Sequence, residues 1–198
     1  MSGRPENQAL HHAHPGGMAI HHESFVTGMA AFGLRCASCE EVGAGVGIAE
    51  ELVGQGMVSA DRIWMAQKTT GCAAWVFGDP VEGVLLLVPL SETGERAVRE
   101  GRFDPGAGVI DHYCRRGDPC FGVYIGVYAG RTRQARGALM RACAACRVSV
   151  FGQVPCFARA ATEDGARSMA TLGFAPAGFG TRDLWVQEAI AGSGRMVA

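Results

Sequence analysis

The sequence predicts a single domain of mixed α/β class. Its 198 residues suffice for one domain with a sizeable core, and a second independent domain would be cramped. With 48% hydrophobic and 19% charged residues, the composition is that of an ordinary globular chain. Apolar runs typical of strands alternate with periodic segments typical of helices, in the order ββ(α)βαβαβ, which predicts helices packed on a mixed sheet.

The chain begins with a histidine-rich segment. Residues 1–28 hold five of the six histidines among glycines and prolines, without a sustained helical or strand period. We expect a flexible or loosely docked arm here, then one domain over residues 29–190 and a flexible tail over residues 191–198. No cysteine or carboxylate follows these histidines at a recognised metal-site spacing, so no metal is predicted.

The segment from Ala31 predicts a short strand followed by a helix. Ser38, with Glu41 three residues later, has the pattern of a capping box and marks the start of that helix. Apolar residues then recur every three or four positions, which predicts one buried helix face: Val42, Val46, Ala49 and Val53.

The middle of the chain predicts a β-hairpin, because the apolar runs CAAWVFG and EGVLLLVPL flank the turn signal Gly78-Asp79-Pro80. A polar, partly helical stretch follows it. The remaining elements are expected to be a strand over residues 120–128, a helix over 133–147, a strand over 155–161, a helix over 162–172 and a last strand over 181–189.

A basic segment joins the long strand to the helix after it. This run, GVYAGRTRQARGALMRA, spans residues 126–142 and carries four arginines. The first-turn amides, from Arg131 to Arg136, have no acceptor within the helix and lie at the positive end of its dipole. Together with the arginine side chains they predict an anion site, typically for phosphate. A basic, solvent-facing helix surface is the alternative interpretation.

Four consecutive stretches carry a resemblance to a known family: YIGVYAG, RTRQARGALMRA, VPCFARAA and ATEDGARSMATLGF. Over about residues 60–188 the chain resembles the GCN5-related N-acetyltransferases, most specifically in RGALMRA and ARSMATLGF. In that family a strand enters a loop of pattern [QR]-x-x-G-x-[GA], whose amides bind the pyrophosphate of coenzyme A. The loop opens a helix, and a strand, a second helix, an LGF motif and a final hairpin follow.

The resemblance implies a central mixed, mostly antiparallel sheet flanked by helices on both faces. It implies direct transfer of an acetyl or other acyl group from acetyl-CoA to an amine on a small molecule or peptide. An amide of the strand before the loop, at about Val127, would hold the oxyanion of the intermediate. The residues expected to contact the coenzyme are Ile125, Val127, Arg131, Thr132, Arg133, Gln134, Ala135, Arg136, Gly137 and Thr162.

The basic loop departs from the family pattern. When Arg131 is taken as its first residue, Gln134 and Arg136 occupy the glycine positions, where side chains narrow the approach of a pyrophosphate. A one-residue gap restores Gly137 as the last position.

The catalytic groups depart as well. Met169 stands where the family often has a tyrosine that protonates the leaving thiolate, and methionine has no proton to give. Tyr128 or solvent would then supply this proton. The candidates for a general base are His112, Glu82 and Asp111.

We expect a cytoplasmic protein without nucleic-acid or membrane partners, and a homodimer is left open. The net charge is −1, and the first residues lack the apolar segment of a secretory signal. The longest apolar run, residues 84–90, is about a third of a membrane-spanning helix.

The eight cysteines are expected to be reduced in that compartment. Cys36 and Cys39 precede a capped helix, as in thioredoxin-like redox pairs, but lack the aromatic and proline neighbours of that motif. Cys143 and Cys146 share an apolar helix face, which predicts packing. About 100 residues separate the two pairs, far more than in a zinc ribbon.

Three functions follow from these patterns. The first is an acyl-CoA-dependent N-acyltransferase, and the second is a catalytically degenerate module of the same fold that binds a ligand or partner. The third is a thiol oxidoreductase that uses Cys36 and Cys39.

Overall fold

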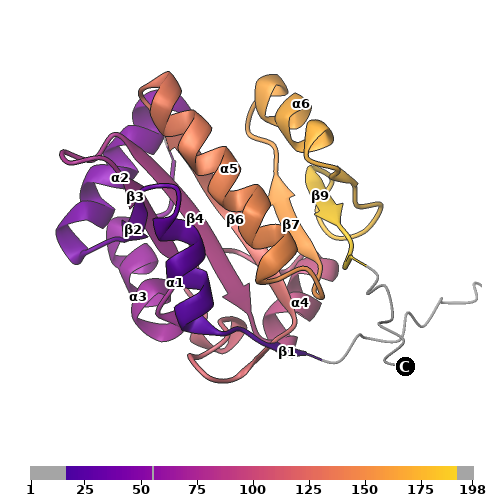
Figure 1. Cartoon of the computed structure of the whole chain (residues 1–198). Helices are drawn as coiled ribbons and strands as arrows, with labels where there is room; N and C mark the ends of the chain where they lie inside the picture. Colours follow the sequence, from indigo (N-terminus) through magenta and orange to yellow (C-terminus); the bar gives the residue numbers. More distant parts are fainter. Residues whose placement is uncertain (1–16, 55, 191–198) are drawn as a thin grey trace, which may run out of the picture.

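A seven-stranded sheet forms the centre of the protein. The computed structural model describes residues 17–54 and 56–190. Its strand order is β2-β3-β4-β6-β7-β9-β8, and within the described residues β6 and β7 are the one parallel pair of this sheet (Figure 1). The strands are β2 (Leu34–Cys36), β3 (Ala74–Phe77), β4 (Gly83–Leu90), β6 (Gly122–Gly130), β7 (Cys156–Arg159), β8 (Ala175–Pro176) and β9 (Leu184–Gln187). The predicted mixed α and β class is confirmed, and the sheet is mostly antiparallel.

Helices cover both faces of this sheet (Figure 1). One face carries α1 (His22–Ala30), α5 (Arg133–Ser149) and α6 (Glu163–Thr171). The other carries α2 (Cys39–Leu52), α3 (Ala60–Thr70) and α4 (Glu92–Arg99), followed by the 3₁₀ turn η1 (Ile110–His112). A separate two-stranded sheet pairs β1 (Met18–Ala19) with β5 (Pro119–Cys120).

The start of α2 has the predicted capping box. The Ser38 hydroxyl accepts a hydrogen bond from the Glu41 N–H at 3.2 Å, and the Glu41 carboxylate accepts one from the Ser38 N–H at 2.9 Å. Further along, Gly45 lets α2 approach β4 closely, because a Cβ there would lie 2.9 Å from a methyl carbon of Val84. The helix therefore lies directly on the sheet.

The prediction of a flexible arm is wrong for residues 18–19, which form β1, and for residues 22–28, which belong to α1. Phe25 and Met29 are fully buried there, and the Phe25 ring packs against Trp75 at a centroid distance of 5.0 Å. Met29 follows Phe25 by four positions, so both lie on one helix face and anchor it to the core. Residues 1–16 and 191–198, which complete the predicted arm and the predicted tail, lie outside the described residues.

The central strand β6 is irregular at Gly126. Leu87 pairs with Ile125 and Leu86 pairs with Val127, so Gly126 is an extra residue that forms a β-bulge. On its other edge β6 pairs with β7 only over residues 123–125, although it continues to residue 130. A gap therefore opens between the two parallel strands, beginning at the bulge.

Candidate functional site

The gap between β6 and β7 exposes the middle of a central strand. Gly126 is exposed, whereas the strand residues at both ends of β6 are buried. A glycine in a strand often marks a place where a ligand approaches the backbone. The β6–β7 gap is therefore the first feature of a candidate site.

The alternation of backbone groups decides which amide faces the gap. The Leu87 N–H donates to the Ala73 carbonyl on β3 at 2.8 Å, so Leu87 directs its backbone groups away from β6. The adjacent Leu86 directs its own groups to β6, where its partner is Val127. The Val127 amide is thus turned toward β4, and that of the next residue, Tyr128, toward the gap.

Helix α5 begins directly beyond the gap. Thr132 caps it, with its hydroxyl accepting from the Ala135 N–H at 3.1 Å and its carbonyl from the Arg136 N–H at 3.0 Å. The N–H groups of Thr132, Arg133 and Gln134 have no acceptor among the described residues. The sequence indicated unpaired amides from Arg131 to Arg136, but those of Arg131, Ala135 and Arg136 have acceptors in the structure.

The arginines of this segment differ in what they contact. Arg131 donates to Glu51 at the end of α2 through Nε at 3.0 Å and Nη2 at 2.7 Å, and its backbone N–H donates to the Glu82 carbonyl. Arg136 folds back onto the loop and donates to the Gly130 carbonyl at 3.0 Å. Arg133 is exposed and makes no hydrogen bond or ion pair with the described residues. Its guanidinium is thus the one of these three available to an anion.

Tyr128 lies on the α5 side of the sheet. Its hydroxyl donates to the Arg136 carbonyl at 2.5 Å, and burial raises the pKa of this hydroxyl. The side chain therefore remains protonated at neutral pH and ties β6 to the first turn of α5. Met169 on α6 is half-buried against the same core.

The three predicted base candidates are not brought together. His112 is buried on the opposite side of the sheet behind Phe103, at a ring-centroid distance of 5.8 Å, and burial lowers its pKa. The backbone carbonyl of Asp111 accepts from the Ser91 hydroxyl in the same turn. Glu82 instead lies at the α5 loop, where its carboxylate accepts from the Thr132 hydroxyl at 3.1 Å.

The remaining predicted coenzyme residues surround the start of α5 and of α6. Ile125 and Gly137 are half-buried, and the Ala135 side chain is fully buried. Thr162 caps α6, with its hydroxyl accepting from the Gly165 N–H at 3.0 Å. Because β6 and β7 are parallel, the helices that follow them begin at the same edge of the sheet, beside the gap.

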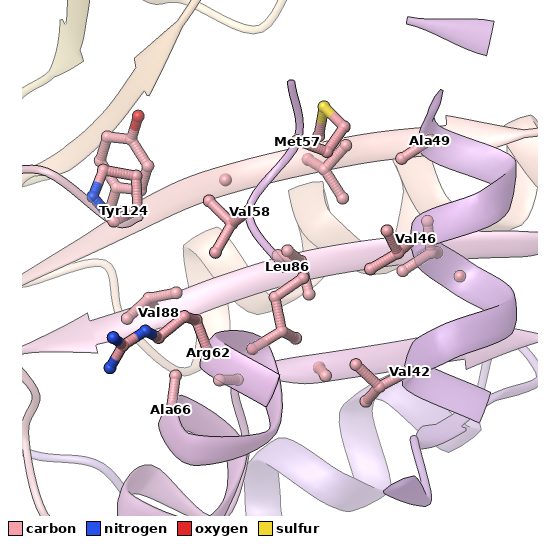
Figure 2. Close-up of a pocket in the computed structure, with 18 of the residues that line it drawn as sticks. Val42, Val46, Ala49, Met57, Val58, Arg62, Ala66, Leu86, Val88 and Tyr124 are labelled. Atoms are coloured by element: carbon pink, nitrogen blue, oxygen red, sulfur yellow. The ribbon is translucent and has the colours of Figure 1, made fainter. Parts of the chain in front are cut away.

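A pocket that the sequence did not reveal lies on the opposite face, between α2, α3 and the sheet (Figure 2). This α2–α3 pocket has a cavity volume of about 60 Å³ and opens to solvent. Its walls are mainly apolar and include Val42, Val46, Ala49, Ile63, Val84 and Leu86. Gly126 and Val127 line it as well, so the pocket and the gap meet at the bulge. Side chains from distant segments form it, and no local motif signals such an arrangement.

The cysteines do not resemble a redox centre. Cys36 is half-buried on β2, and burial raises the pKa of its thiol, the opposite of what a nucleophilic thiol needs. Cys143 and Cys146 are buried on α5 as predicted, where burial raises their pKa values to about 12 and about 11.

Within residues 17–54 and 56–190, no group of histidine, cysteine and acidic side chains is arranged to hold a metal ion. Among the helices of that part of the chain, none has the length and apolar character needed to cross a membrane. In comparisons with known proteins, no family model matches the chain and no curated protein matches it.

Proposed function

We propose that the protein is an acyl-CoA-dependent N-acyltransferase that moves an acetyl or other acyl group to an amine by direct transfer. The observation that carries this proposal is the exposed Gly126 in the central strand, at the mouth of the β6–β7 gap. An acyl group in this gap would lie against the backbone of β6. Acetyl-CoA is the proposed co-substrate, and the acceptor is an amine on a small molecule or peptide.

The start of α5 supports a coenzyme in this position. The amides of Thr132, Arg133 and Gln134 are unpaired among the described residues, and they lie at the positive end of the helix dipole. Such a helix start, reached from a strand, suits a pyrophosphate. The Arg133 guanidinium would add a charge-assisted contact. The order strand, loop, helix, strand and helix matches the resemblance seen in the sequence.

The chemistry requires an amide that holds the developing oxyanion. When the amine attacks the thioester carbonyl, the negative charge grows on the carbonyl oxygen, and a backbone N–H aimed at it lowers the barrier. The backbone alternation favours the Tyr128 amide for this role over that of Val127, which is turned toward β4. The C–S bond then breaks, and the nitrogen loses a proton.

The leaving thiolate must take up a proton. The Tyr128 hydroxyl already donates to the Arg136 carbonyl, so it would have to leave that acceptor to serve as the acid. Because a thiol has a pKa of about 8.5, its thiolate can also be protonated by water near neutral pH. We therefore propose solvent as the proton source, with Tyr128 as a residue that positions the loop.

A degenerate module that binds a ligand without turnover is the second candidate. It is favoured by Gln134, exposed at a loop position where the family has glycine, and by Met169 in place of the usual acid. Measuring both binding and turnover separates the two candidates, because a degenerate module would still bind the ligand but would not catalyse acyl transfer.

The test measures acetyl-CoA binding and acetyl transfer on the full chain. Acetyl-CoA at about 100 times its dissociation constant should stabilise the fold by ~2.7 kcal/mol, which raises the melting temperature by about 5–10 °C. Release of free thiol in the presence of an amine would then identify the transferase. Binding without thiol release would favour the degenerate module, and no thermal shift at millimolar acetyl-CoA would contradict both.

A further inference from the structure

Cys114 and Cys120 stand at the two ends of a short loop beside the end of β4. The Cys114 N–H donates to the Pro89 carbonyl at 2.9 Å, and the N–H of Phe121, next to Cys120, donates to the Leu90 carbonyl at 2.9 Å. Both ends of the loop are thus anchored to consecutive residues of one strand. Both cysteine side chains belong to the core cluster beneath α1 and α5, so the two thiols are held on the same face of the sheet.

The two thiols lie within hydrogen-bonding reach of each other. Both are free thiols, and they are 5% and 0% exposed. The Cys114 sulfur also lies 3.3 Å from the Asp118 carbonyl oxygen, and the Cys120 sulfur lies 3.0 Å from the Gly122 carbonyl oxygen. A disulfide requires Cβ atoms about 3.5–4.5 Å apart, so two thiols already in contact need only a small movement to form one.

The contact makes the two thiols chemically unequal. The hydrogen bond from Cys120 lowers the pKa of Cys114, against the opposite effects of burial and of Asp118. The same contact, together with burial, raises the pKa of Cys120, which stays protonated as the donor. On α5, by contrast, burial raises the pKa values of Cys143 and Cys146 to about 12 and about 11. Cys114 therefore has the larger fraction of thiolate, the reactive form of cysteine.

Only the loop itself covers this pair from solvent on its side of the fold. All five residues between the cysteines, residues 115–119, are exposed. Gly117 in the middle of the loop has a φ of 95°, and an added Cβ there would meet no atom within 4 Å. Exposed loops with few contacts open locally at low free-energy cost. A molecule as small as hydrogen peroxide can therefore reach Cys114 when the loop moves.

We propose that Cys114 and Cys120 form a peroxide-sensitive dithiol, which a hydroperoxide converts into a reversible intramolecular disulfide. The Cys114 thiolate attacks a peroxide oxygen, the O–O bond breaks, and Cys114 becomes a sulfenic acid while the other oxygen takes up a proton and leaves as water. The Cys120 sulfur then attacks the Cys114 sulfur, the S–O bond breaks, and a second water leaves. In sum, two thiols and one hydrogen peroxide give one disulfide and two waters. This inference does not depend on the proposed acyl transfer.

The test treats the reduced full-length protein with hydrogen peroxide, blocks the remaining thiols with N-ethylmaleimide and maps the tryptic peptides by mass spectrometry. Trypsin cuts after Arg115 and Arg116, between the two cysteines, so the disulfide would join peptides 103–115 and 117–131. We expect this linked pair, and dithiothreitol should release it. Cys143 and Cys146, three positions apart on α5, are the control pair and should oxidise about 10-fold more slowly or less.

Two serine variants separate the roles of the two thiols. Cys120→Ser keeps the attacking thiol without its partner, so Cys114 should accumulate as a sulfenic acid that dimedone traps. Cys114→Ser should leave Cys120 as a free thiol. The wild-type experiment decides even if a variant fails to fold. Wild-type protein that retains both thiols while the exposed Cys39 is oxidised would overturn the proposal, and so would oxidation of Cys114 to sulfinic acid without the linked peptides.

Discussion

The hydroxyl of Tyr128 donates a hydrogen bond to the backbone carbonyl of Arg136 at 2.5 Å. This contact ties the central strand β6 to the first turn of α5, the two elements that border the proposed coenzyme site. The same residue directs its backbone amide toward the gap. Tyr128 therefore links the position of the loop to the position of the proposed oxyanion donor.

Tyr128→Phe tests whether this residue positions the loop or transfers a proton. Loss of one hydrogen bond should lower the free energy of unfolding by about 0.5–1.5 kcal/mol. We expect kcat to stay within about 10-fold of wild type, because a general acid contributes more, about 10²–10⁴-fold. Steady-state kinetics across pH 6–9, about the range in which thiols and amines titrate, provide the measurement. A fall of about 100-fold or more with a changed pH profile would assign the proton to Tyr128.

The arginines of the loop should differ in their effect on coenzyme binding. Arg133 has no protein partner among the described residues, so Arg133→Ala should weaken CoA binding by ~10-fold or more, less so at high salt. Arg131→Ala should have a smaller effect, because this side chain is already paired with Glu51. Calorimetry at two salt concentrations, with Arg141→Ala as control, measures this. Equal CoA affinities of the wild type and all three variants would indicate that these arginines form a solvent-facing basic surface.

Sequence signals predicted those helices and strands that have a clear capping residue, turn residue or apolar periodicity. Ser38 and Glu41 predicted the cap of α2, and Gly78-Asp79-Pro80 predicted the β3–β4 turn. Helix α3 was missed although Ser59 precedes it and Gly71 ends it with a φ of 75°. Its buried positions are spaced as on one helix face, but two of the four are polar: Ile63, Ala66, Gln67 and Thr70. The apolar period is therefore weak, and contacts with α2 and the sheet stabilise the helix.

Only those parts of the candidate site that follow one another in the sequence were predictable. The loop at Thr132 follows from sequence order, but the gap at Gly126 depends on how far β7 pairs with its neighbour. Arg62, Tyr113 and Tyr124 all line the α2–α3 pocket, although they come from segments far apart in the sequence. Such long-range arrangements depend on tertiary packing, which periodicity and capping signals do not encode.

His112 should make the stability depend on pH. Burial, with a further contribution from Arg102, lowers its pKa below the unfolded value of about 6.5, so the fold favours the neutral ring. The neutral His112 ring therefore contributes to the free energy of unfolding above the unfolded-state pKa, and this contribution is lost as the pH falls toward the lower pKa of the folded state. Urea unfolding between pH 5 and 7.5, roughly bracketing the histidine pKa, should show a steeper acid loss in wild type than in His112→Phe. Parallel curves would contradict the lowered pKa.

Cys36 and Cys39 should not support thiol chemistry. Burial raises the pKa of Cys36, which lowers the fraction of reactive thiolate at neutral pH. Cys36→Ser should therefore leave acyl transfer within a few-fold of wild type, and the wild-type protein should not reduce insulin disulfides. Dithiol-dependent insulin reduction that Cys36→Ser removes would restore the oxidoreductase hypothesis.

Gly126→Ala should separate function from folding most directly. Gly126 does not need a left-handed backbone, and an added Cβ would meet the Leu86 Cβ at 3.4 Å, an ordinary contact. We expect the free energy of unfolding to change by less than ~1 kcal/mol. The new methyl group would nevertheless stand at the exposed mouth of the gap, where the acyl group is proposed to lie. kcat/KM for acetyl-CoA should therefore fall by about 10-fold or more, the equivalent of at least about 1.4 kcal/mol.

Gly43→Ala is the matched control for this prediction, because it adds the same methyl group on the exposed side of α2, with nothing within 4 Å. Relative to glycine, alanine in a helix should stabilise the fold by up to about 1 kcal/mol and leave the kinetics unchanged. Both variants are compared by urea unfolding and by thiol release under the same conditions. Wild-type kinetics in Gly126→Ala would mean that the acyl group does not pass the bulge, and the transfer site would then have to lie away from β6. If only Gly126→Ala loses activity, and its free energy of unfolding is unchanged, then acyl transfer takes place at Gly126. This residue is the one exposed position of the central strand β6.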